Sequence, residues 1–444
     1  MKSLIFTILL IWINFILAIH SQTPYYPPID TDFWESITPT ELGWNENKIN
    51  DFYEYLNEKN SKAFILLKDG RIVLEKYFDT FTKDSLWYWA SAGKTLTATL
   101  VGIAQEEGLI DINEKTSKYL GEGWTSLPKE KEDLIKVLHQ LTMTTGLDYN
   151  VEDLDCTNPE CLKYKADAGT QWYYHNAPYT LLEKVVEKAT GQNYNIYTSQ
   201  KIRNQIGMNG AWIKLGFNNV YFSNARSMAR FGILISSNGF WENKNIIKDK
   251  TYLNQMINTS QNLNKSYGYL WWLNGKESCM IPGSTRVFNT MLIPDAPFDT
   301  YAALGKDGQC LNISPSKGLI WVRMGERPDN QFFISTNFSN EIWRYLNQIM
   351  QTTDLAEEKN ANSLVVFPNP ASDYIEISNN VETGLRPVST TQEIKIFNIL
   401  GECVITVETQ HTVSLQRIDI SSLPVGLYYI SFDDRVFSFL KVCK

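Results

Sequence analysis

The sequence predicts an α+β fold, in which one antiparallel sheet is flanked by helices and carries a helical subdomain, followed by a small all-β sandwich. Three observations support this prediction. Strand-like runs occur towards both ends of the first 350 residues, and long helical patterns lie between them. Residues 351–363 are mostly polar, as is typical of a linker. Short β-rich runs with turn signals between them then recur to the end of the chain.

The first 21 residues have the pattern of an export signal. Lys2 precedes an apolar run over residues 4–19, which only Thr7 and Asn14 interrupt, and small and polar residues follow. The run is sixteen residues long, which is short for a helix that spans a membrane. We therefore expect residues 1–21 to be a cleaved signal peptide, and the alternative is an uncleaved membrane anchor.

The composition argues against several classes of function. The 444 residues carry a formal net charge of −8 and contain no block of Lys or Arg, so nucleic acid and anionic membranes are poor candidates for the main partner. The chain has four histidines and neither an H-E-x-x-H nor a C-x-x-C motif, which argues against a zinc enzyme. It also lacks the G-x-S-x-G nucleophile motif. We expect no metal and no cofactor, and any hydrolytic chemistry needs a base other than a triad histidine.

Export would permit disulfides, and the cysteine count of six is even. Six cysteines allow 15 sets of three pairs, and the sequence does not choose among them. Position along the chain suggests Cys156–Cys161, Cys403–Cys443 and Cys279–Cys310. The alternative is that the cysteines are free and buried.

The first domain opens with an irregular segment and a hairpin. Residues 23–45 are rich in Pro, Trp and Tyr and predict a lead-in without regular structure. Two β-rich runs follow, at 63–68 and 71–78, and Asp69-Gly70 joins them. This dipeptide between two β-rich runs is a strong signal for a tight hairpin.

Helical patterns occupy the middle of the domain. One covers residues 91–107 and ends at Gly108, and a second follows Asn176 and ends at Gly191. Each has apolar residues at helical spacing and a glycine at its end, as helices commonly do. Residues 196–260 read as helix and loop.

Strand-like runs return in the second half of the domain. They lie at 267–273, 301–304, 310–314 and 319–324. A helix at 340–350 closes the region. Since the strands lie at both ends with helices between them, we expect a single antiparallel sheet with a helical insertion.

The terminal domain is β-rich throughout. Its runs lie at 364–367, 374–377, 394–399, 404–407, 427–432 and 436–442. Their short lengths and regular turn signals favour a sandwich of two sheets.

Ser91 and Lys94 form an S-x-x-K pattern where the long helical pattern begins. Residues three apart on a helix share one face, so the Lys94 amine can reach the Ser91 hydroxyl. Burial would lower the pKa of Lys94 towards that of a useful base. The same pattern occurs elsewhere in the chain, so spacing alone leaves open a Ser91 that caps the helix and a Lys94 at the surface.

Tyr174 and Asn176 lie about 80 residues further on, at the start of the second helix. A tyrosine can act in proton transfer when a nearby lysine stabilises its phenolate. An asparagine here can bind a substrate carbonyl with its amide. Asn176 is equally suited to cap the helix.

Taken together, these residues resemble the serine β-lactamase and penicillin-binding-protein superfamily, and specifically the class C-like serine hydrolases. The resemblance covers about residues 45–350. The segments that carry it are WASAGKTLTATLVGIAQEEGLIDINE, IKVLHQLTMTTGLDYN, WYYHNAPYTLLEKVVEKATGQ and SYGYLWWLNGK.

The resemblance implies a β-lactamase/transpeptidase-like fold and a reaction through an acyl-enzyme on a small ester or amide. Ser91 falls on the family's nucleophile, Lys94 on its lysine, and Tyr174 and Asn176 on its tyrosine and asparagine. Two alternatives remain at this point. The chain could be a catalytically idle binding protein on the same fold, or a true β-lactamase or D-amino-acid peptidase.

The family's third motif departs from its usual form. K-T-G or H-x-G aligns with Ala303-Leu304-Gly305, so Gly305 is kept while Ala303 replaces the cation or imidazole that helps bind a substrate carboxylate. β-Lactam turnover is therefore doubtful. Lys306 could supply a charge instead, or could point to solvent. The resemblance also makes the backbone N–H groups of Ser91 and Lys306 the expected oxyanion hole.

Two histidines lie near these motifs. We expect His139 to be structural. His175 stands between Tyr174 and Asn176, where the family usually has a small residue, and it could contact substrate.

The terminal domain resembles the type A C-terminal sorting domain of the type IX secretion system. The matching segments are VVFPNPASDYIEI, IKIFNILGECV, IDISSLPVGLYYISF and FLKVCK. The resemblance covers residues 364–444 and implies export through the periplasm and outer membrane by that machinery, followed by cleavage or surface attachment. The alternative is a carbohydrate-binding or adhesive sandwich. The expected domains are thus a signal peptide (1–21), a hydrolase (22–350), a linker (351–363) and a sorting domain (364–444).

Overall fold

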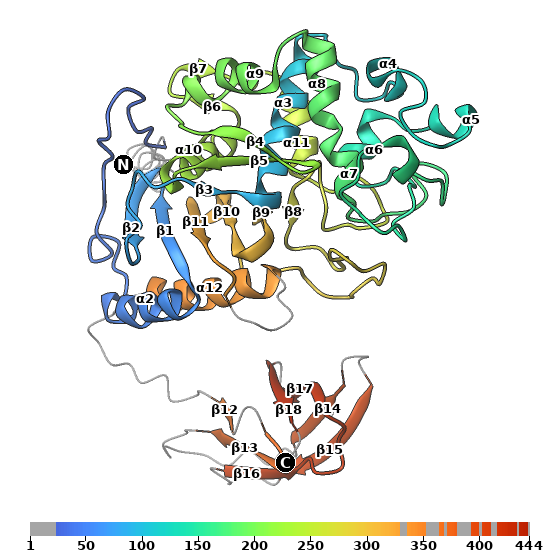
Figure 1. Cartoon of the computed structure of the whole chain (residues 1–444). Helices are drawn as coiled ribbons and strands as arrows, with labels where there is room; N and C mark the ends of the chain where they lie inside the picture. Colours follow the sequence, from blue (N-terminus) through green and yellow to red (C-terminus); the bar gives the residue numbers. More distant parts are fainter. Residues whose placement is uncertain are drawn as a thin grey trace, which may run out of the picture. The chain divides into compact units, whose positions relative to one another are not determined.

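A computed structural model describes most of the chain (Figure 1). The described residues are 24–328, 335–351, 364–367, 371–379, 392–398, 402–409, 415–432 and 435–442. The chain divides into two compact units, Met1–Thr353 and Asp354–Lys444. The expected signal peptide, nearly all of the expected linker and Cys443 lie outside the described residues. In the described part, no helix is both long and apolar enough to cross a membrane.

The first unit is built on one six-stranded antiparallel sheet. Its order is β2-β1-β11-β10-β9-β8. The bounds are β1 (Ser61–Lys68), β2 (Arg71–Tyr77), β8 (Trp272–Leu273), β9 (Tyr301–Leu304), β10 (Cys310–Ser314) and β11 (Leu319–Gly325). The prediction that both ends of this unit contribute to a single sheet is confirmed. Since β1 lies between β2 and β11, its residues Phe64 to Leu67 are fully buried.

The hairpin between β1 and β2 forms as predicted. Asp69 and Gly70 have φ of 48° and 86°, which is the left-handed pair that a two-residue turn requires. The lead-in crosses directly over this turn, because Tyr25 N donates to Asp69 O at 2.9 Å. A Cβ on Gly70 would lie 2.0 Å from Tyr25 O, so this position also needs glycine for space.

Helices cover both faces of the sheet (Figure 1). On one face, α10 (Ala225–Ser236) comes so close that a Cβ on Gly232 would lie 2.9 Å from the side chain of Leu311 on β10. On the other face, Trp343 of α12 (Ser335–Met350) donates from Nε1 to Asn312 Oδ1 at 3.1 Å. Leu311 and Asn312 are adjacent on β10 and therefore point to opposite faces, so the sheet lies between α10 and α12.

Helix α2 (Ile49–Glu58), which our sequence analysis missed, packs beside α12. Phe52 and Tyr345 have ring centroids 5.6 Å apart, and Tyr55 and Tyr345 4.6 Å apart. Only Phe52 and Leu56 of this helix are buried, so its sequence is mainly polar and lacks a strong apolar pattern. The helix gains its place from the aromatic contacts with α12, which lie almost 300 residues away.

The helical subdomain surrounds α3 (Lys94–Glu106), whose residues from Lys94 to Ala104 are all buried. The other helices are α4 (Ser117–Leu120), α5 (Lys129–Glu132), α6 (Val137–Leu141), α7 (Asn176–Thr180), α8 (Leu182–Thr190), α9 (Tyr194–Lys201) and α11 (Lys250–Met256). The predicted helix after Asn176 is confirmed as α7 and α8. Gly191 ends α8 in the left-handed conformation, with φ of 68°.

Two predictions about strands in this unit were wrong. The segment read as helix and loop contains the hairpin of β4 (Ala211–Leu215) and β5 (Asn218–Ser223), which pairs with β3 (Trp87–Tyr88). In the predicted run 267–273, only β8 is a strand. Its remaining residues are buried in a loop, with Leu270 at φ 62°. A short apolar run reports burial, and burial alone does not require pairing with a strand.

The cysteines are paired only in part. Cys156 and Cys161 form a disulfide, as one of the expected pairings proposed. Cys279 and Cys310 are both buried and free, so the pairing between them is wrong. Burial raises the pKa of the Cys279 thiol to about 11 and that of Cys310 to about 12, which makes both thiols unreactive at neutral pH. Cys403 is free and exposed.

The second unit has two sheets around one core. The orders are β12-β13-β16 and β15-β14-β17-β18. The strands are β12 (Leu364–Phe367), β13 (Tyr374–Asn379), β14 (Gln392–Phe397), β15 (Cys403–Thr409), β16 (Leu415–Asp419), β17 (Gly426–Phe432) and β18 (Arg435–Lys441). Buried isoleucines from both sheets, including Ile375 and Ile396, meet in this core. Strand β16 was missed because exposed Arg417 and Asp419 flank its buried Ile418, which leaves no apolar run.

We predict that a chain ending at Gln351 folds without the second unit. The described residues form separate hydrophobic cores in the two units. Its unfolding temperature in calorimetry should therefore lie within about 3 °C of that of the full chain, a shift that corresponds to roughly 1 kcal/mol.

A chain ending at residue 334 is the matched control. It also lacks α12, whose Ile342, Leu346 and Ile349 are fully buried. Losing a buried side chain of this size costs about 2 kcal/mol or more, so this shorter chain should not fold. If the chain ending at Gln351 also failed to fold, the independence of the two cores would be wrong.

Candidate active site

The backbone around Ser91 is tightly constrained. Strand β3 leads into the 3₁₀ turn η2 (Ala90–Gly93), and α3 begins directly afterwards at Lys94. Ser91 therefore lies in the turn before the helix, whereas we had expected it in the first turn of the helix itself. Ala90 has φ of 48°, which is a strained conformation for a residue with a Cβ. Fully buried Trp89 anchors the turn by donating from Nε1 to Ser223 Oγ at 2.7 Å.

Lys94 is buried at the centre of the site, with 3% of its surface exposed. Its Nζ lies 3.1 Å from Ser91 Oγ and 2.9 Å from Asn176 Oδ1. The ammonium group also lies 4.1 Å from the ring centroid of Tyr179. Burial lowers the pKa of Lys94 to about 7, although the negative charge of Asp155 partly opposes this. Lys94 can therefore be neutral near physiological pH, unlike a surface lysine.

Tyr174 lies on the other side of Ser91. Its ring stacks on Trp272 at a centroid distance of 5.5 Å and meets Tyr267 edge-on at 6.3 Å. Burial raises the pKa of the Tyr174 phenol, and its hydrogen bond with Ser91 opposes this only in part. The phenol is thus neutral at physiological pH, and it is held against the Ser91 hydroxyl.

Asn176 links two parts of the site. It is the first residue of α7, and the N-cap position belongs to His175, so the alternative in which Asn176 caps the helix is wrong. Its amide instead makes two side-chain hydrogen bonds. Oδ1 accepts from Lys94 Nζ, and Nδ2 donates to Asp155 Oδ1 at 2.8 Å. Ser91, Lys94, Tyr174 and Asn176 are therefore brought together as the sequence predicts.

The end of β9 lies directly against the turn that holds Ser91. A Cβ on Gly305 would be 2.5 Å from Trp89 O and 3.1 Å from Ala92 N, so only glycine fits between the strand and the turn. Ala303 is buried within β9, with 1% of its surface exposed. Lys306 is exposed, and no ion pair engages it among the residues that the structure describes.

A buried arginine holds the turn after Gly305, and sequence reasoning missed it. Arg323 is fully buried on β11 and donates from Nη1 to Asp307 O at 2.8 Å. On the other side, Tyr88 Oη donates to Asp307 Oδ2 at 2.8 Å. These bonds fix the turn η5 (Lys306–Gly308), in which Asp307 has φ of 60°. No local sequence pattern marks Arg323, because its partners are backbone carbonyl groups from distant segments.

Neither histidine near the motifs lines the site. His139 Nδ1 accepts from Lys136 N at 3.1 Å and closes the start of α6, which is a structural role. His175 has 3% of its surface exposed and Nδ1 lacks a hydrogen-bond partner, so it is enclosed and does not face a substrate. Burial lowers the pKa of both to about 4, so neither carries charge at neutral pH.

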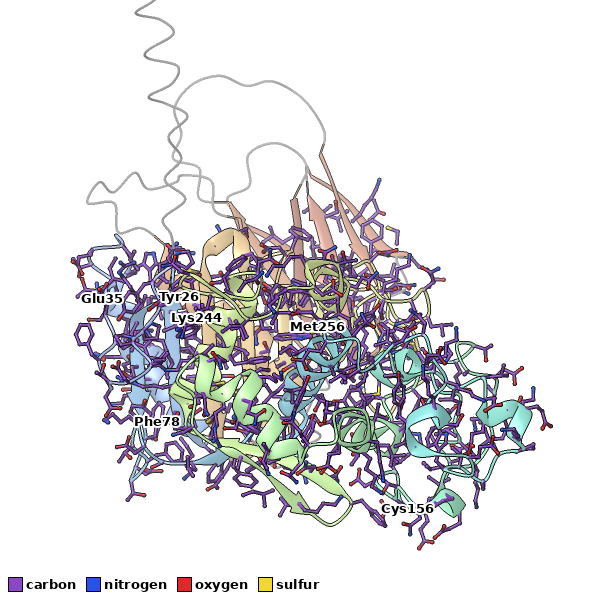
Figure 2. All side chains as sticks on the ribbon, turned by 90° about the horizontal axis from the view of Figure 1, so that it is seen from above. Tyr26, Glu35, Phe78, Cys156, Lys244 and Met256 are labelled. Atoms are coloured by element: carbon purple, nitrogen blue, oxygen red, sulfur yellow. A yellow bond between two sulfur atoms is a disulfide. The ribbon has the colours of Figure 1, made fainter. Side chains whose placement is uncertain are left out.

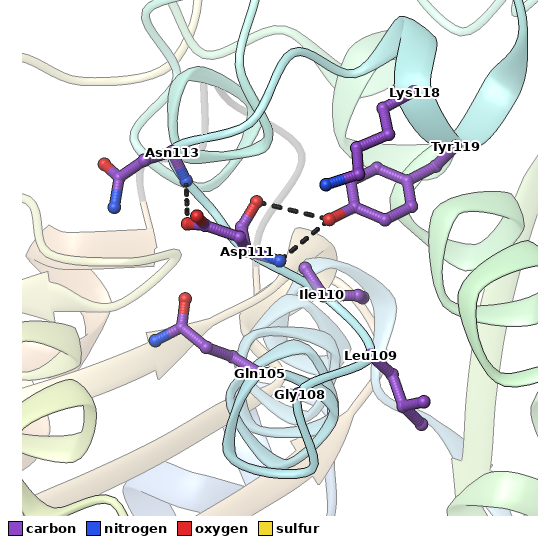
Figure 3. A pocket seen from close by; sticks show the side chains of 8 residues that line it. All are labelled: Gln105, Gly108, Leu109, Ile110, Asp111, Asn113, Lys118 and Tyr119. Atoms are coloured by element: carbon purple, nitrogen blue, oxygen red, sulfur yellow. Dashed lines mark hydrogen bonds between the residues drawn. The ribbon is translucent and has the colours of Figure 1, made fainter.

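A separate surface pocket of about 530 Å³ lies at the far end of α3 (Figure 3). It is lined by residues from Gln105 to Tyr119 and contains none of the predicted site residues. Gln105 is eleven residues from Lys94, which corresponds to roughly 16 Å along a helix. Its most prominent polar contact, Asp111 N donating to Tyr119 Oη at 2.8 Å, is internal to the fold.

The antiparallel sheet with its helical insertion, and the serine, lysine and tyrosine beside the end of β9, define a β-lactamase/transpeptidase-like protein. The chain belongs to the β-lactamase family, whose sequence model matches residues 57–337. A second family model, that of the secretion system C-terminal sorting domain, matches residues 365–441. The expected family and fold of both parts are confirmed.

Relatives with curated names are hydrolases of several kinds. The 6-aminohexanoate-dimer hydrolase of Paenarthrobacter ureafaciens is 22% identical over 324 residues, covering 64% of this chain and 76% of that protein. The teichoic acid D-alanine hydrolase of Staphylococcus aureus is 32% identical over 127 residues, covering 26% of this chain and 30% of that protein.

Solved structures of low sequence identity share the fold. A Bacillus anthracis protein described as a candidate 6-aminohexanoate-dimer hydrolase superimposes with a TM-score of 0.56 at 20% identity, over 74% of this chain and 91% of that one. A class C β-lactamase mutant has a TM-score of 0.52 at 17% identity, over 68% of this chain and 96% of that one. At these identities the likeness concerns the fold alone.

Proposed function

We propose that this serine hydrolase cleaves a small ester or amide through an acyl-enzyme on Ser91. The observation that carries the proposal is the contact between Ser91 Oγ and Lys94 Nζ at 3.1 Å, made by a lysine whose burial lowers its pKa to about 7. A hydroxyl needs an adjacent base to become a nucleophile. A neutral amine within hydrogen-bond distance meets that requirement.

In the first step, neutral Lys94 accepts the Ser91 proton as Oγ attacks the carbonyl carbon of the substrate. The negative charge that develops on the carbonyl oxygen needs preorganised N–H donors. The N–H groups of Ser91 and Lys306 are suited to this role, since each lies at the beginning of a 3₁₀ turn. The first N–H groups of a helical turn have no partner within that turn.

In the second step, the leaving group departs with a proton and the acyl group remains on Ser91. We assign the relay of this proton to the neutral phenol of Tyr174, because it hydrogen-bonds to Ser91 and stands beside Lys94. Asn176, held by Lys94 and Asp155, orients the substrate. Water then attacks the acyl-enzyme, with Lys94 and Tyr174 acting in reverse order, and releases the acid.

The rival reading is a binding protein on the same fold that does no chemistry. The observation that favours it is Ala303, which removes the usual cation from the strand beside the nucleophile. A panel of p-nitrophenyl esters, D- and L-aminoacyl amides and nitrocefin distinguishes the two. Turnover of at least one of these substrates by the purified protein supports the hydrolase, and turnover of none supports the binding protein.

We predict that carboxylate-bearing β-lactams are poor substrates and that neutral esters are better ones. Ala303 is buried and uncharged, so it cannot pair with a carboxylate. Losing a charge-assisted hydrogen bond typically costs 1.5–3 kcal/mol, or roughly 10- to 100-fold in kcat/KM. The kcat/KM for nitrocefin should therefore fall well below that for p-nitrophenyl acetate. Efficient nitrocefin hydrolysis would show that another group binds the carboxylate.

The second unit addresses the protein for export, because residues 365–441 match the secretion system sorting domain. We propose that the type IX machinery delivers the hydrolase to the cell surface or the medium, and that the sorting domain is cleaved or anchored there. In the native host, a chain ending at Gln351 should accumulate as active enzyme in the periplasm. If it were secreted normally and had a raised KM for a polymeric substrate, the second unit would be a binding module instead.

A further inference from the structure

Asp155 approaches the site from a loop outside the motifs. It accepts from Asn176 Nδ2 at 2.8 Å, while Asn176 Oδ1 accepts from Lys94 Nζ at 2.9 Å and Lys94 Nζ lies 3.1 Å from Ser91 Oγ. A continuous path of side-chain hydrogen bonds therefore runs from Asp155 to the candidate nucleophile. Asp155 makes no ion pair among the residues that the structure describes, so its carboxylate is committed to this path.

The direction of the Asn176 amide depends on Asp155. An ionised carboxylate only accepts hydrogen bonds, whereas an amide has one accepting and one donating end. Asp155 therefore selects the NH₂ end of Asn176 and turns the carbonyl oxygen towards Lys94. That oxygen takes one N–H of Lys94 and leaves the lone pair of a neutral amine free for the Ser91 proton. With the amide reversed, its NH₂ group would compete for that lone pair.

The loop is built to hold Asp155 in place. Just before it, Leu154 O accepts from Ala177 N at 3.1 Å, which ties the loop to α7. Just after it, Cys156 is joined to Cys161. The two ends of the loop meet in the bridge between Leu147 and Tyr164. Figure 2 shows Cys156 on the helical side of the unit, away from Phe78 at the end of the first hairpin.

We propose that Asp155 is a positioning residue for the Ser91–Lys94 pair, which sets the direction of the Asn176 amide and is itself held by the Cys156–Cys161 cross-link. The inference rests on the proposed function, since it concerns the activation of Ser91. It adds a residue and a disulfide that lie outside the sequence motifs of the site.

The charges around Lys94 give the proposal a specific signature. The groups that face Lys94 are the phenols of Tyr174 and Tyr179 and the carboxylate of Asp155. Burial raises the pKa of both phenols, so they stay neutral. Asp155 alone among them is charged near pH 7, and its charge raises the pKa of Lys94. Removing this charge should lower the pKa of Lys94, whereas a loosened, wetter pocket would raise it.

The experiment measures the rate at which a fluorophosphonate labels the full chain as a function of pH, for the wild type, Asp155→Asn and Glu152→Gln. Glu152 is exposed on the same loop, so Glu152→Gln removes an equal charge without touching the path. At pH 8, Asp155→Asn should react about 10-fold more slowly, as expected for a lost hydrogen bond to a charged group. Its acid limb should move to lower pH by at least about half a unit. Glu152→Gln should match the wild type.

The cross-link is tested by Cys156→Ser combined with Cys161→Ser, which should also slow labelling at pH 8. Three results would overturn the proposal: wild-type rates in Asp155→Asn, an acid limb that moves to higher pH in this variant, or an equal effect of Glu152→Gln. If the wild type itself were not labelled, the proposed function would fall, and the positioning role with it.

Discussion

Replacing Ser91 by alanine should reduce kcat by roughly 10⁴-fold or more, while leaving the fold intact. Loss of a nucleophile removes the covalent route altogether, and only binding and the oxyanion donors remain to assist water. Ser91 is partly exposed, and its printed side-chain contacts are those with Lys94 and Tyr174. The unfolding temperature should therefore change little. The measurement is kcat on the best ester from the substrate panel, with calorimetry on the same preparation.

The matched control is a serine that has the same S-x-x-K spacing but lies elsewhere. Ser126 precedes Lys129 by three residues, and its hydroxyl donates to Leu162 O at 3.0 Å, away from the site. Ser126→Ala should keep near wild-type kcat. Full activity in Ser91→Ala would mean that another group carries the reaction.

Replacing Lys94 by methionine should reduce kcat by roughly 10²–10⁴-fold, the range for losing general acid–base assistance. In the wild type, kcat/KM should fall below about pH 7, where Lys94 becomes protonated, and Lys94→Met should lack this limb. Tyr174→Phe is the informative comparison. It should also lower kcat, but it should retain the limb, since Lys94 remains. A wild-type profile that is flat between pH 5 and 9 would contradict the role of Lys94 as base.

Stability gives a second readout for the same variant. Folding lowers the pKa of Lys94 from 10.5 to about 7, so between these values the unfolded chain binds a proton that the folded chain does not. This contribution makes the wild type less stable as the pH falls from 10.5 to 7, and constant below that. Lys94→Met lacks it. The variant should therefore gain unfolding temperature relative to the wild type as the pH is lowered from 10 to 7.

Features that depend on local sequence could be predicted. The hairpin at Asp69-Gly70 needs two left-handed residues, and the chain supplies two that tolerate this conformation. The long helix α3 is apolar over four turns and ends near Gly108. Ser91 and Lys94 are three residues apart, so the geometry of the chain itself brings them together. In each case the determining interactions lie within a few residues.

Features that depend on distant partners could not be predicted. Helix α2 gains its place from Tyr345, and the turn after Gly305 is held by Arg323. Asp155 lies in an irregular loop, and no motif marks its contact with Asn176. The hairpin of β4 and β5 was missed because its exposed strand reads as neither alternating nor apolar. These elements are fixed by packing and by hydrogen bonds to segments far away in the sequence.

The most direct test of the central claim is intact-mass analysis of the full chain after exposure to a fluorophosphonate. An activated serine displaces fluoride and keeps the phosphonyl group. We expect one adduct per chain, mapped by peptide analysis to Ser91, no adduct in Ser91→Ala, and slow labelling in Lys94→Met. A folded wild-type protein without an adduct, or with the adduct on another serine, would contradict the assignment of Ser91 as the nucleophile.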